Sequence, residues 1–230
     1  MVKENKKNAP ACVGIIMDGN RRWSKEQGVS AALGHREGYK KLKEVVIWAK
    51  EEGIENLVVY AFSTENWNRS KKEINTLMKL FGNVLKQQDF FKKEKINVRF
   101  IGHIDKFSDD LKKGIKEMEN STKKYDNLKL SIALSYGGRA EIVSAVNSLL
   151  QRGIKKVSED EFSKEMWMKD NPDPEIIIRT GGEKRLSNFL AWQSVYSELF
   201  FVDTYWPAFT KNEFKGIVAK YFKREKRKGK

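Results

Sequence analysis

The chain has 230 residues, of which 40% are hydrophobic and 33% charged, a balance typical of one folded globular domain rather than a disordered protein. Its 45 Lys and Arg residues exceed its 31 Asp and Glu residues and give a net charge of +14, which favours an anionic partner such as nucleic acid, lipid headgroups or a phosphorylated substrate. The single cysteine, Cys12, and the well-separated His35 and His103 exclude disulfides and a Cys/His zinc cluster, so a catalytic metal would need oxygen ligands.

The hydrophobic pattern also bears on location. No apolar run approaches the roughly 18 residues of a membrane-spanning helix, and the first residues lack the apolar stretch of a signal peptide. We therefore expect a cytoplasmic protein. A single domain over residues 1–230 is predicted, with an ordered part at about 10–222 and basic tails at 1–9 and 223–230.

Short apolar runs alternate along the chain with longer segments of helical period. The runs predicted as strands are Cys12–Met17, Asn56–Phe62, Asn97–Ile101, Leu128–Leu134, Glu175–Ile178 and Glu198–Val202. Glu37–Glu52 and Lys71–Glu94 carry apolar residues on one face and are predicted as amphipathic helices. Because the connections are long enough to return the chain in the same direction, we expect an α/β fold with a mostly parallel six-stranded sheet flanked by helices.

Three segments that follow predicted strands are rich in arginine, amide and hydroxyl groups. They are Asp18–Trp23, Ser63–Arg69 and Arg179–Asn188. Any one of them alone could be an ordinary loop, with Asp18 or Ser63 capping a helix and the arginines paired with surface acids. Ligands of open α/β sheets bind beyond the carboxyl ends of strands, however, and so many arginines at one edge would repel one another without an anion. A magnesium-bound diphosphate is the favoured ligand.

Other kinds of phosphate or polyanion binding lack support. The sequence contains no P-loop, no GxGxxG helix start and no kinase-like catalytic set, so nucleotide hydrolysis is a poor interpretation. No nucleic-acid-binding motif accompanies the positive charge, and no nucleic-acid partner is expected. Peripheral association with an anionic membrane, driven by the basic tail, remains a secondary expectation.

Several of these segments together resemble the cis-prenyltransferases, the undecaprenyl diphosphate synthase family. The segments are Ile15–Trp23, Gly34-His35, Tyr60–Arg69, Ser135–Arg139, Arg179–Phe189 and Trp192–Leu199, and the resemblance runs from about Cys12 to Phe222. It implies a homodimeric, Mg²⁺-dependent enzyme. Its substrates would be isopentenyl diphosphate and an allylic diphosphate, farnesyl or geranylgeranyl diphosphate, with each new double bond cis.

The resemblance also implies roles for individual residues. Asp18 would share Mg²⁺ with the diphosphate, Glu198 would be a second metal-associated carboxylate, and Asn66 would act with Ser63 where a proton leaves isopentenyl diphosphate. The residues expected to hold the allylic diphosphate are Gly19, Asn20, Arg21, Arg22 and His35, and those expected to hold isopentenyl diphosphate are Arg179, Arg185 and Ser187. Further residues expected to contact substrate are Trp23, Ser63, Thr64, Glu65, Trp67, Arg69 and Leu186.

The growing chain would require a dry tunnel, and the apolar faces of Glu37–Glu52 and Lys71–Glu94 could line it, although the same faces would serve equally as core. Phe62 and Trp67 are expected to pack against the isoprenoid or to close a mobile loop rather than to stack on bases.

The sequence departs from the family pattern at three places. Many bacterial relatives have glycine at the position of Arg21, an additional arginine where this chain reads Val29–Leu33, including Ala31, and histidine at the position of Lys184. A lysine cannot ligate magnesium, and we hypothesise that Arg21 compensates for the missing arginine. A non-catalytic subunit of a heteromeric synthase is the alternative from another class. Such a subunit would lose the aspartate or the C-terminal arginine-rich segment, and this chain retains both.

Overall fold

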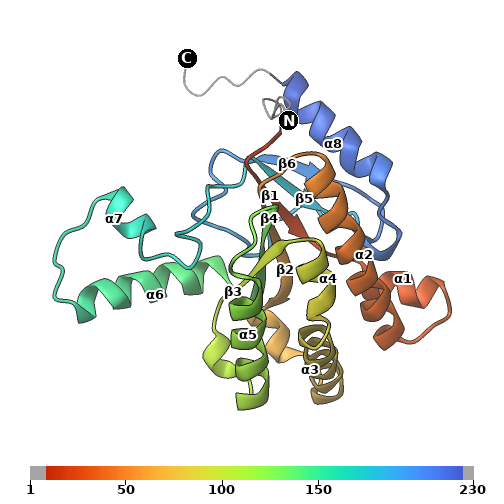
Figure 1. Cartoon of the computed structure of the whole chain (residues 1–230), viewed down its shortest axis with the longest axis horizontal. Coiled ribbons are helices and arrows are strands. Elements are labelled where there is room, and N and C mark those ends of the chain that lie inside the picture. Colours follow the sequence, from red (N-terminus) through yellow and green to blue (C-terminus); the bar gives the residue numbers. More distant parts are fainter. Residues whose placement is uncertain (1–8, 225–230) are drawn as a thin grey trace.

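The computed structural model describes residues 9–224, and within them six strands form one sheet in the order β3-β4-β2-β1-β5-β6 (Figure 1). The strands are β1 (Cys12–Ile16), β2 (Asn56–Ser63), β3 (Ile96–Ile101), β4 (Leu128–Tyr136), β5 (Ile176–Arg179) and β6 (Glu198–Phe201). The six predicted strands are therefore confirmed, with small shifts at their ends. Neighbouring strands are parallel throughout, because each connection crosses over and returns the chain in the same direction.

The helices that the structure describes are α1 (Asn20–Glu26), α2 (Ala31–Glu51), α3 (Lys71–Leu85), α4 (Gln88–Lys93), α5 (Asp109–Thr122), α6 (Gly138–Gln151), α7 (Glu159–Ser163) and α8 (Lys211–Lys223), with 3-10 turns η1 (Thr64–Asn68), η2 (Ile104–Lys106) and η3 (Trp206–Ala208). Helix α2 begins earlier than predicted because the Ser30 hydroxyl accepts a hydrogen bond from the Leu33 N–H and caps it. The single helix predicted over Lys71–Glu94 is wrong. The helix is interrupted between α3 and α4, and this interruption places Phe91 in the core.

The period-two pattern of the strands divides the core between the two faces of the sheet. Val13 and Ile15 of β1 face the larger cluster, which also contains buried residues of α2, α3, α4, α5 and α8. Cys12 and Ile16 face a smaller cluster. Each fully buried aliphatic side chain contributes about 1.5–3 kcal/mol, so these faces determine the register of the strands.

The smaller cluster is covered by non-helical chain. From outside the sheet, Met168, Phe189 and Leu190 pack against it. Gly14 of β1 permits this close approach, because a Cβ atom there would lie 3.1 Å from the Phe189 ring. The segment that carries the third arginine-rich loop is thus anchored across the sheet.

Helices α6 and α7 project from the side of the sheet, at the left of Figure 1. They form their own small cluster from Ala145, Leu149, Phe162 and Met166. The opposite side of α6 leaves Val143, Val146 and Leu150 exposed, an apolar stripe at helical spacing.

The predicted tails at residues 1–9 and 223–230 lie almost wholly outside the described residues. Lys223 and Arg224 are described and depart from that prediction, since Lys223 ends α8 and the Arg224 guanidinium pairs with Glu198. Between residues 9 and 224, no helix combines the length and apolar character needed to cross a bilayer.

Candidate active site

The order of the strands creates a crevice at the carboxyl edge of the sheet. From β1 the chain moves to β2 on one side, whereas β5 and β6 lie on the other side. The loops that follow β1 and β5 therefore diverge, and ligands of parallel sheets bind at such a point. Asp18 follows β1 and Arg179 ends β5, so the strand order brings together two residues that are far apart in the sequence.

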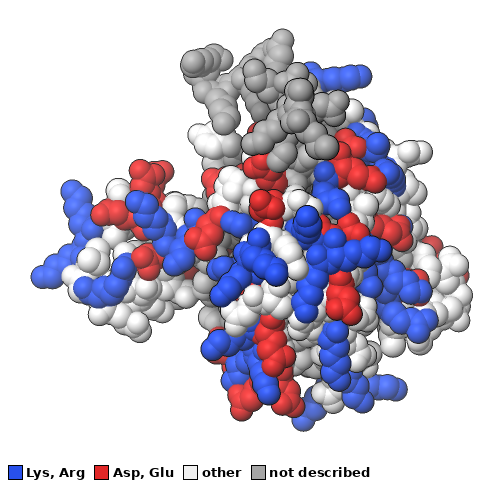
Figure 2. Space-filling view, viewed as in Figure 1, with Lys and Arg blue, Asp and Glu red and all other residues white. Residues whose placement is uncertain are grey.

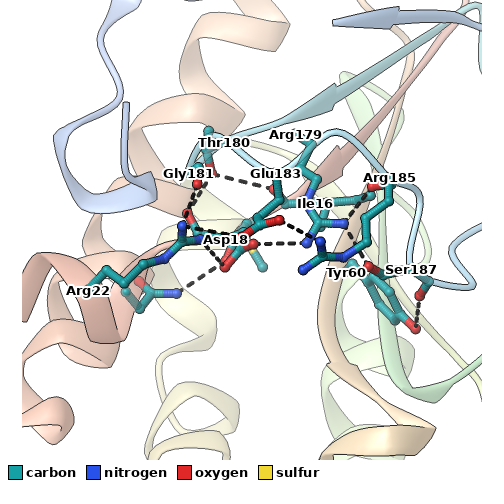
Figure 3. Close-up of polar contacts among 12 residues, drawn as sticks. Ile16, Asp18, Arg22, Tyr60, Arg179, Thr180, Gly181, Glu183, Arg185 and Ser187 are labelled. Carbon is teal, nitrogen blue, oxygen red and sulfur yellow. Dashed lines mark hydrogen bonds and ion pairs between the residues drawn. The ribbon is translucent and has the colours of Figure 1, made fainter. Parts of the chain in front are cut away.

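Asp18 lies between two guanidinium groups, as Figure 3 shows. Its Oδ2 accepts a hydrogen bond from Arg179 Nη2 at 2.9 Å, and its Oδ1 lies 3.1 Å from Arg22 Nη2. Arg22 is held from the other end, since its Nη1 donates to the Gly181 carbonyl oxygen at 2.6 Å. The Asp18 side chain is 30% exposed, so its carboxylate remains accessible to a ligand.

The interpretation of Asp18 as a helix cap is wrong. The residue at the N-terminus of α1 is Gly19, with φ 106°, and no side chain caps that end. Glycine is required there both for its left-handed conformation and for space, because a Cβ atom would lie 2.7 Å from the Tyr205 ring. The turn directs Asp18 into the crevice and leaves the first N–H groups of α1 beside it, where an anion is favoured.

Arg179 organises the third loop. Its side chain is only 5% exposed, and its Nη1 donates to Ser187 Oγ at 2.7 Å and to the Arg185 carbonyl oxygen at 2.5 Å. Arg185 itself is exposed and pairs with Glu183. Arg179, Arg185 and Ser187, which the sequence grouped, therefore lie in one hydrogen-bonded unit.

A basic pocket lies beside Asp18. Arg21, Arg22, Lys25, His35 and Arg69 line it together with the chain at 17–20. Burial, together with Arg69 and Arg21, lowers the pKa of His35 from 6.5 to about 4, so its imidazole is neutral near pH 7. Its buried Nε2 has no hydrogen-bond partner within the described chain. Such an orphaned polar atom in a cationic pocket fits a site for an anionic ligand.

An apolar pocket opens from the same place. Its cavity volume is about 90 Å³, it lies between α2, α3, α5 and the sheet, and its lining includes Leu42, Leu77, Phe81, Phe107, Leu111 and Ile132. Met17, Asn20 and His35 line both this pocket and the basic one. The expected apolar faces of α2 and α3 thus surround a cavity as well as contributing to the core. A ligand with an anionic head and an apolar tail matches the two adjoining pockets.

The second loop is held by its own hydrogen bonds. The Asn66 amide oxygen accepts the Ser63 N–H at 3.1 Å, and the Glu65 carboxylate accepts a bond from Asn188 Nδ2 at 3.0 Å. Although partial burial opposes it, this bond and others from neighbouring hydroxyl groups lower the pKa of Glu65, which is therefore ionised at neutral pH. Arg69 pairs with Glu73 of α3 at 2.9 Å, and Arg21 lies 3.6 Å from the same carboxylate.

Some predicted contact residues lie away from these pockets. Five of them line neither the basic pocket, nor the apolar pocket, nor the cleft between the three loops: Trp23, Thr64, Trp67, Arg185 and Leu186. Trp67 packs edge-on against Phe62, with 5.0 Å between the ring centroids, and its Nε1 donates a hydrogen bond to Ser135 Oγ at 2.9 Å. These two aromatic residues therefore anchor the second loop to the core.

Glu198 is not brought to Asp18 within the chain. It begins β6, opposite Ile176 at the start of β5, and so lies at the amino edge of the sheet. Asp18 lies at the carboxyl edge. The Glu198 carboxylate pairs instead with Arg224. The predicted strand Glu198–Val202 begins at Glu198, whereas Asp18 follows its predicted strand, so a parallel sheet already separates the two residues.

Several residues at the site were missed. Lys25 lines the basic pocket, and Asn188 and Tyr60 line the cleft between the three loops. Tyr60 Oη lies 3.1 Å from the Tyr136 carbonyl oxygen and 3.3 Å from that of Ser187, and burial raises its pKa, so the hydroxyl stays protonated and donates. Asn188 stands directly after Ser187 in the arginine-rich loop, a signal that could have found it. Tyr60 begins the Tyr60–Arg69 segment of the family resemblance, and this was its signal besides its place in a strand.

On the face shown in Figure 2, the positive charge does not form one continuous basic surface. In Figure 2, Lys and Arg side chains are spread over the viewed face and interspersed with Asp and Glu. The arginines described above are concentrated instead in the crevice. This distribution fits a small anionic ligand better than a nucleic-acid groove.

Comparison with known proteins agrees with this geometry. Residues 16–229 match the family described as "Putative undecaprenyl diphosphate synthase". An isoprenyl transferase of Fusobacterium nucleatum is 45% identical over 224 residues, 97% of this chain and 97% of the relative. A tritrans,polycis-undecaprenyl-diphosphate synthase (geranylgeranyl-diphosphate specific) of Thermococcus kodakarensis is 44% identical over 96% of this chain and 88% of its own.

A solved structure shows the same fold. The crystal structure of lavandulyl diphosphate synthase from Lavandula x intermedia, in complex with dimethylallyl diphosphate, matches with a TM-score of 0.92 at 29% identity, over 97% of this chain and 100% of that one. The parallel sheet, the arginine-lined crevice and these relatives lead to one conclusion: the chain belongs to the undecaprenyl diphosphate synthase family, the cis-prenyltransferases.

Proposed function

We propose that the protein lengthens an allylic diphosphate with isopentenyl diphosphate units to make a cis-polyprenyl diphosphate. The observation that carries the proposal is the shared wall of the two pockets, where Met17, Asn20 and His35 border both the basic pocket and the apolar cavity. A prenyl diphosphate has the matching form, a charged head on an apolar tail. Each buried CH₂ group of the tail contributes about 0.8 kcal/mol, so the cavity favours an apolar tail.

The allylic diphosphate is assigned to the basic pocket. Arg22 and Arg21 supply charge-assisted hydrogen bonds, the N-terminus of α1 at Gly19 and Asn20 supplies N–H groups, and neutral His35 supplies a further polar group. Charge on the leaving diphosphate increases as its bond to C1 breaks, so these contacts strengthen in the transition state. The unpartnered Nε2 of His35 would find its partner in this ligand.

Isopentenyl diphosphate is assigned to the third loop, to Arg179, Arg185 and Ser187. A new bond forms between C4 of isopentenyl diphosphate and C1 of the allylic substrate, the C1–O bond breaks, and a proton leaves C2. The Asn66 side chain is engaged as an acceptor of the Ser63 N–H, and an amide is a feeble base. We assign the proton to the departing diphosphate or to water, with Asn66 and Ser63 shaping the cleft.

Asp18 fits a magnesium site through its accessible carboxylate at the mouth of the basic pocket. Magnesium keeps several water ligands and commonly binds one or two carboxylates together with substrate phosphates, so one protein carboxylate is sufficient. In the described part of the chain no group of three or more His, Cys, Asp and Glu could hold a metal alone, which suits a metal that arrives with its diphosphate. Bound there, Mg²⁺ would neutralise charge on the leaving group.

The metal role predicted for Glu198 would require a second chain, given its place at the opposite edge of the sheet. A homodimer is part of the proposal, and two exposed apolar groups support it. One is the stripe of α6 with Val143, Val146 and Leu150; the other, Val195, Tyr196 and Leu199, surrounds Glu198 in the sequence. Several large apolar side chains exposed in one segment are typical of protein interfaces.

The primer and the location are also proposals. The Thermococcus kodakarensis relative is named for geranylgeranyl diphosphate, and farnesyl diphosphate is the other primer we propose. We further propose a cytoplasmic enzyme that associates peripherally with anionic membranes, for which the net charge of +14 is the supporting observation.

The test mixes purified protein with labelled isopentenyl diphosphate and farnesyl or geranylgeranyl diphosphate, with Mg²⁺ in one set and EDTA in the other. The extracted products are then sized. We expect a ladder of longer polyprenols with magnesium and none with EDTA. No elongation with either primer would contradict the proposed reaction, and undiminished elongation in EDTA would contradict the metal requirement.

A further inference from the structure

Asn188 connects three separate parts of the site. Its Nδ2 donates to the Glu65 carboxylate of the second loop at 3.0 Å, and its Oδ1 accepts the Arg139 N–H at the start of α6 at 2.9 Å. Its backbone carbonyl oxygen also accepts the Gly138 N–H at 2.7 Å. Both ends of the side-chain amide are therefore used, each toward a different segment of the chain.

The backbone around Asn188 is strained. Ser187, Asn188 and Leu190 have φ values of 49°, 66° and 46°, the left-handed region that non-glycine residues seldom adopt. Such conformations persist only where surrounding contacts hold them. Asparagine tolerates this region better than most residues, but tolerance does not explain why its side chain reaches two other segments.

The neighbouring glycines leave room for this connection. A Cβ atom on Gly137 would lie 2.6 Å from Asn188 Nδ2 and 2.7 Å from Thr64 Oγ1, and one on Gly138 would lie 2.6 Å from Ala191 Cβ. The start of α6, the second loop and the third loop are thus packed against one another at Asn188 with no spare space.

The consequence reaches the residues that hold substrate. Ser187, next to Asn188, accepts from Arg179 through its hydroxyl and from Tyr60 through its carbonyl oxygen. Arg179 in turn bonds Asp18. A shift of Asn188 would therefore displace Ser187 relative to Arg179 on one side of the cleft and Glu65 on the other.

We infer that Asn188 is a positioning residue, whose Glu65–Asn188–Arg139 bridge holds the third loop in the geometry that binds isopentenyl diphosphate. The inference rests on the proposed function, which assigns that substrate to Arg179, Arg185 and Ser187. Because the bridge supports ground state and transition state alike, its loss weakens binding uniformly and raises KM more than it lowers kcat.

The experiment compares steady-state kinetics of purified wild type with three variants. Asn188→Asp keeps the shape and the acceptor for Arg139 but places a carboxylate against Glu65. Asn188→Gly keeps the left-handed backbone and removes the bridge. The double variant Asn188→Asp with Glu65→Gln reverses the bond, since the amide introduced at position 65 can donate to the carboxylate introduced at position 188.

A matched control is Asn212→Asp, the same chemical change at an exposed position of α8. Circular dichroism and thermal melts establish that each variant is folded. Elongation by the wild type in the same assay tests the proposed function separately. If the inference alone fails, the wild type is active and the variants have unaltered KM values.

We expect Asn188→Asp and Asn188→Gly to raise KM for isopentenyl diphosphate by roughly tenfold or more, with KM for the allylic primer within about twofold. The double variant should recover most of the KM lost in Asn188→Asp, and Asn212→Asp should match wild type. A wild-type KM for isopentenyl diphosphate in Asn188→Gly would overturn the inference. So would a double variant with the same KM as Asn188→Asp, or an equal rise of KM for isopentenyl diphosphate and for the primer.

Discussion

Replacing Asp18 with alanine should affect stability and catalysis in a defined way. The carboxylate is bonded to Arg179, which is 5% exposed, and lies 3.1 Å from Arg22. Removing one partner of a buried ion pair costs about 3–5 kcal/mol. Asp18 is 30% exposed and Arg179 retains Ser187 and the Arg185 carbonyl oxygen, so screening and the remaining bonds reduce the cost to about 2 kcal/mol. For a chain of this size the melting temperature should fall by about 4–8 °C.

Catalysis and anion binding should respond in opposite directions. Loss of the proposed magnesium ligand should lower kcat by about 10²-fold or more. The pocket meanwhile gains a net positive charge, so inorganic diphosphate without metal should raise the melting temperature of Asp18→Ala more than that of wild type.

The assay is differential scanning fluorimetry with and without diphosphate, followed by product analysis with magnesium. The control is Asp126→Ala, which removes an exposed carboxylate from the loop before β4. If Asp18→Ala and Asp126→Ala melt at the same temperature, the stabilisation assigned to the Asp18–Arg179 pair is refuted. If diphosphate raises the melting temperature of Asp18→Ala less than that of wild type, the electrostatic reasoning is refuted. Normal turnover would refute the catalytic role.

Three further predictions concern His35, the cavity and the proposed dimer. Because the pKa of His35 is about 4 in the folded chain and 6.5 ordinarily, the unfolded chain alone is protonated between these values. Stability should therefore fall by up to about 3 kcal/mol as pH drops through that window, and urea unfolding should show a smaller fall in His35→Gln. Leu111→Trp should fill part of the apolar cavity and shorten the products at unchanged primer KM, and products of wild-type length would contradict this role of the cavity. Leu150→Asp, at a side chain 63% exposed on α6, should weaken the proposed dimer, as measured by light scattering, and a dimer as stable as that of wild type would exclude α6 from the interface.

Local pattern was sufficient for much of the fold. Alternation and apolar runs located the strands because each strand must bury one or both faces, and a period of two is visible without knowing the neighbours. It failed over Lys71–Glu94, where the same apolar stripe serves α3 and α4 and the break depends on Phe91 reaching a core built by other segments. The cavity beneath α2 and α3 was expected from the family resemblance and not from the pattern, because a stripe that lines a cavity and a stripe that fills a core have the same spacing.

The opening sign of function was an excess of arginine in loops that follow strands, and this much the sequence determined by itself: residue types and their order along the chain specify an anion site at a sheet edge and the family to which the chain belongs. Which residues share that site was decided by tertiary structure. The strand order placed Asp18 against Arg179, and the packing of three loops made Asn188 their common contact. The physical reason is that contacts between distant segments depend on strand order and direction, which no local spacing records.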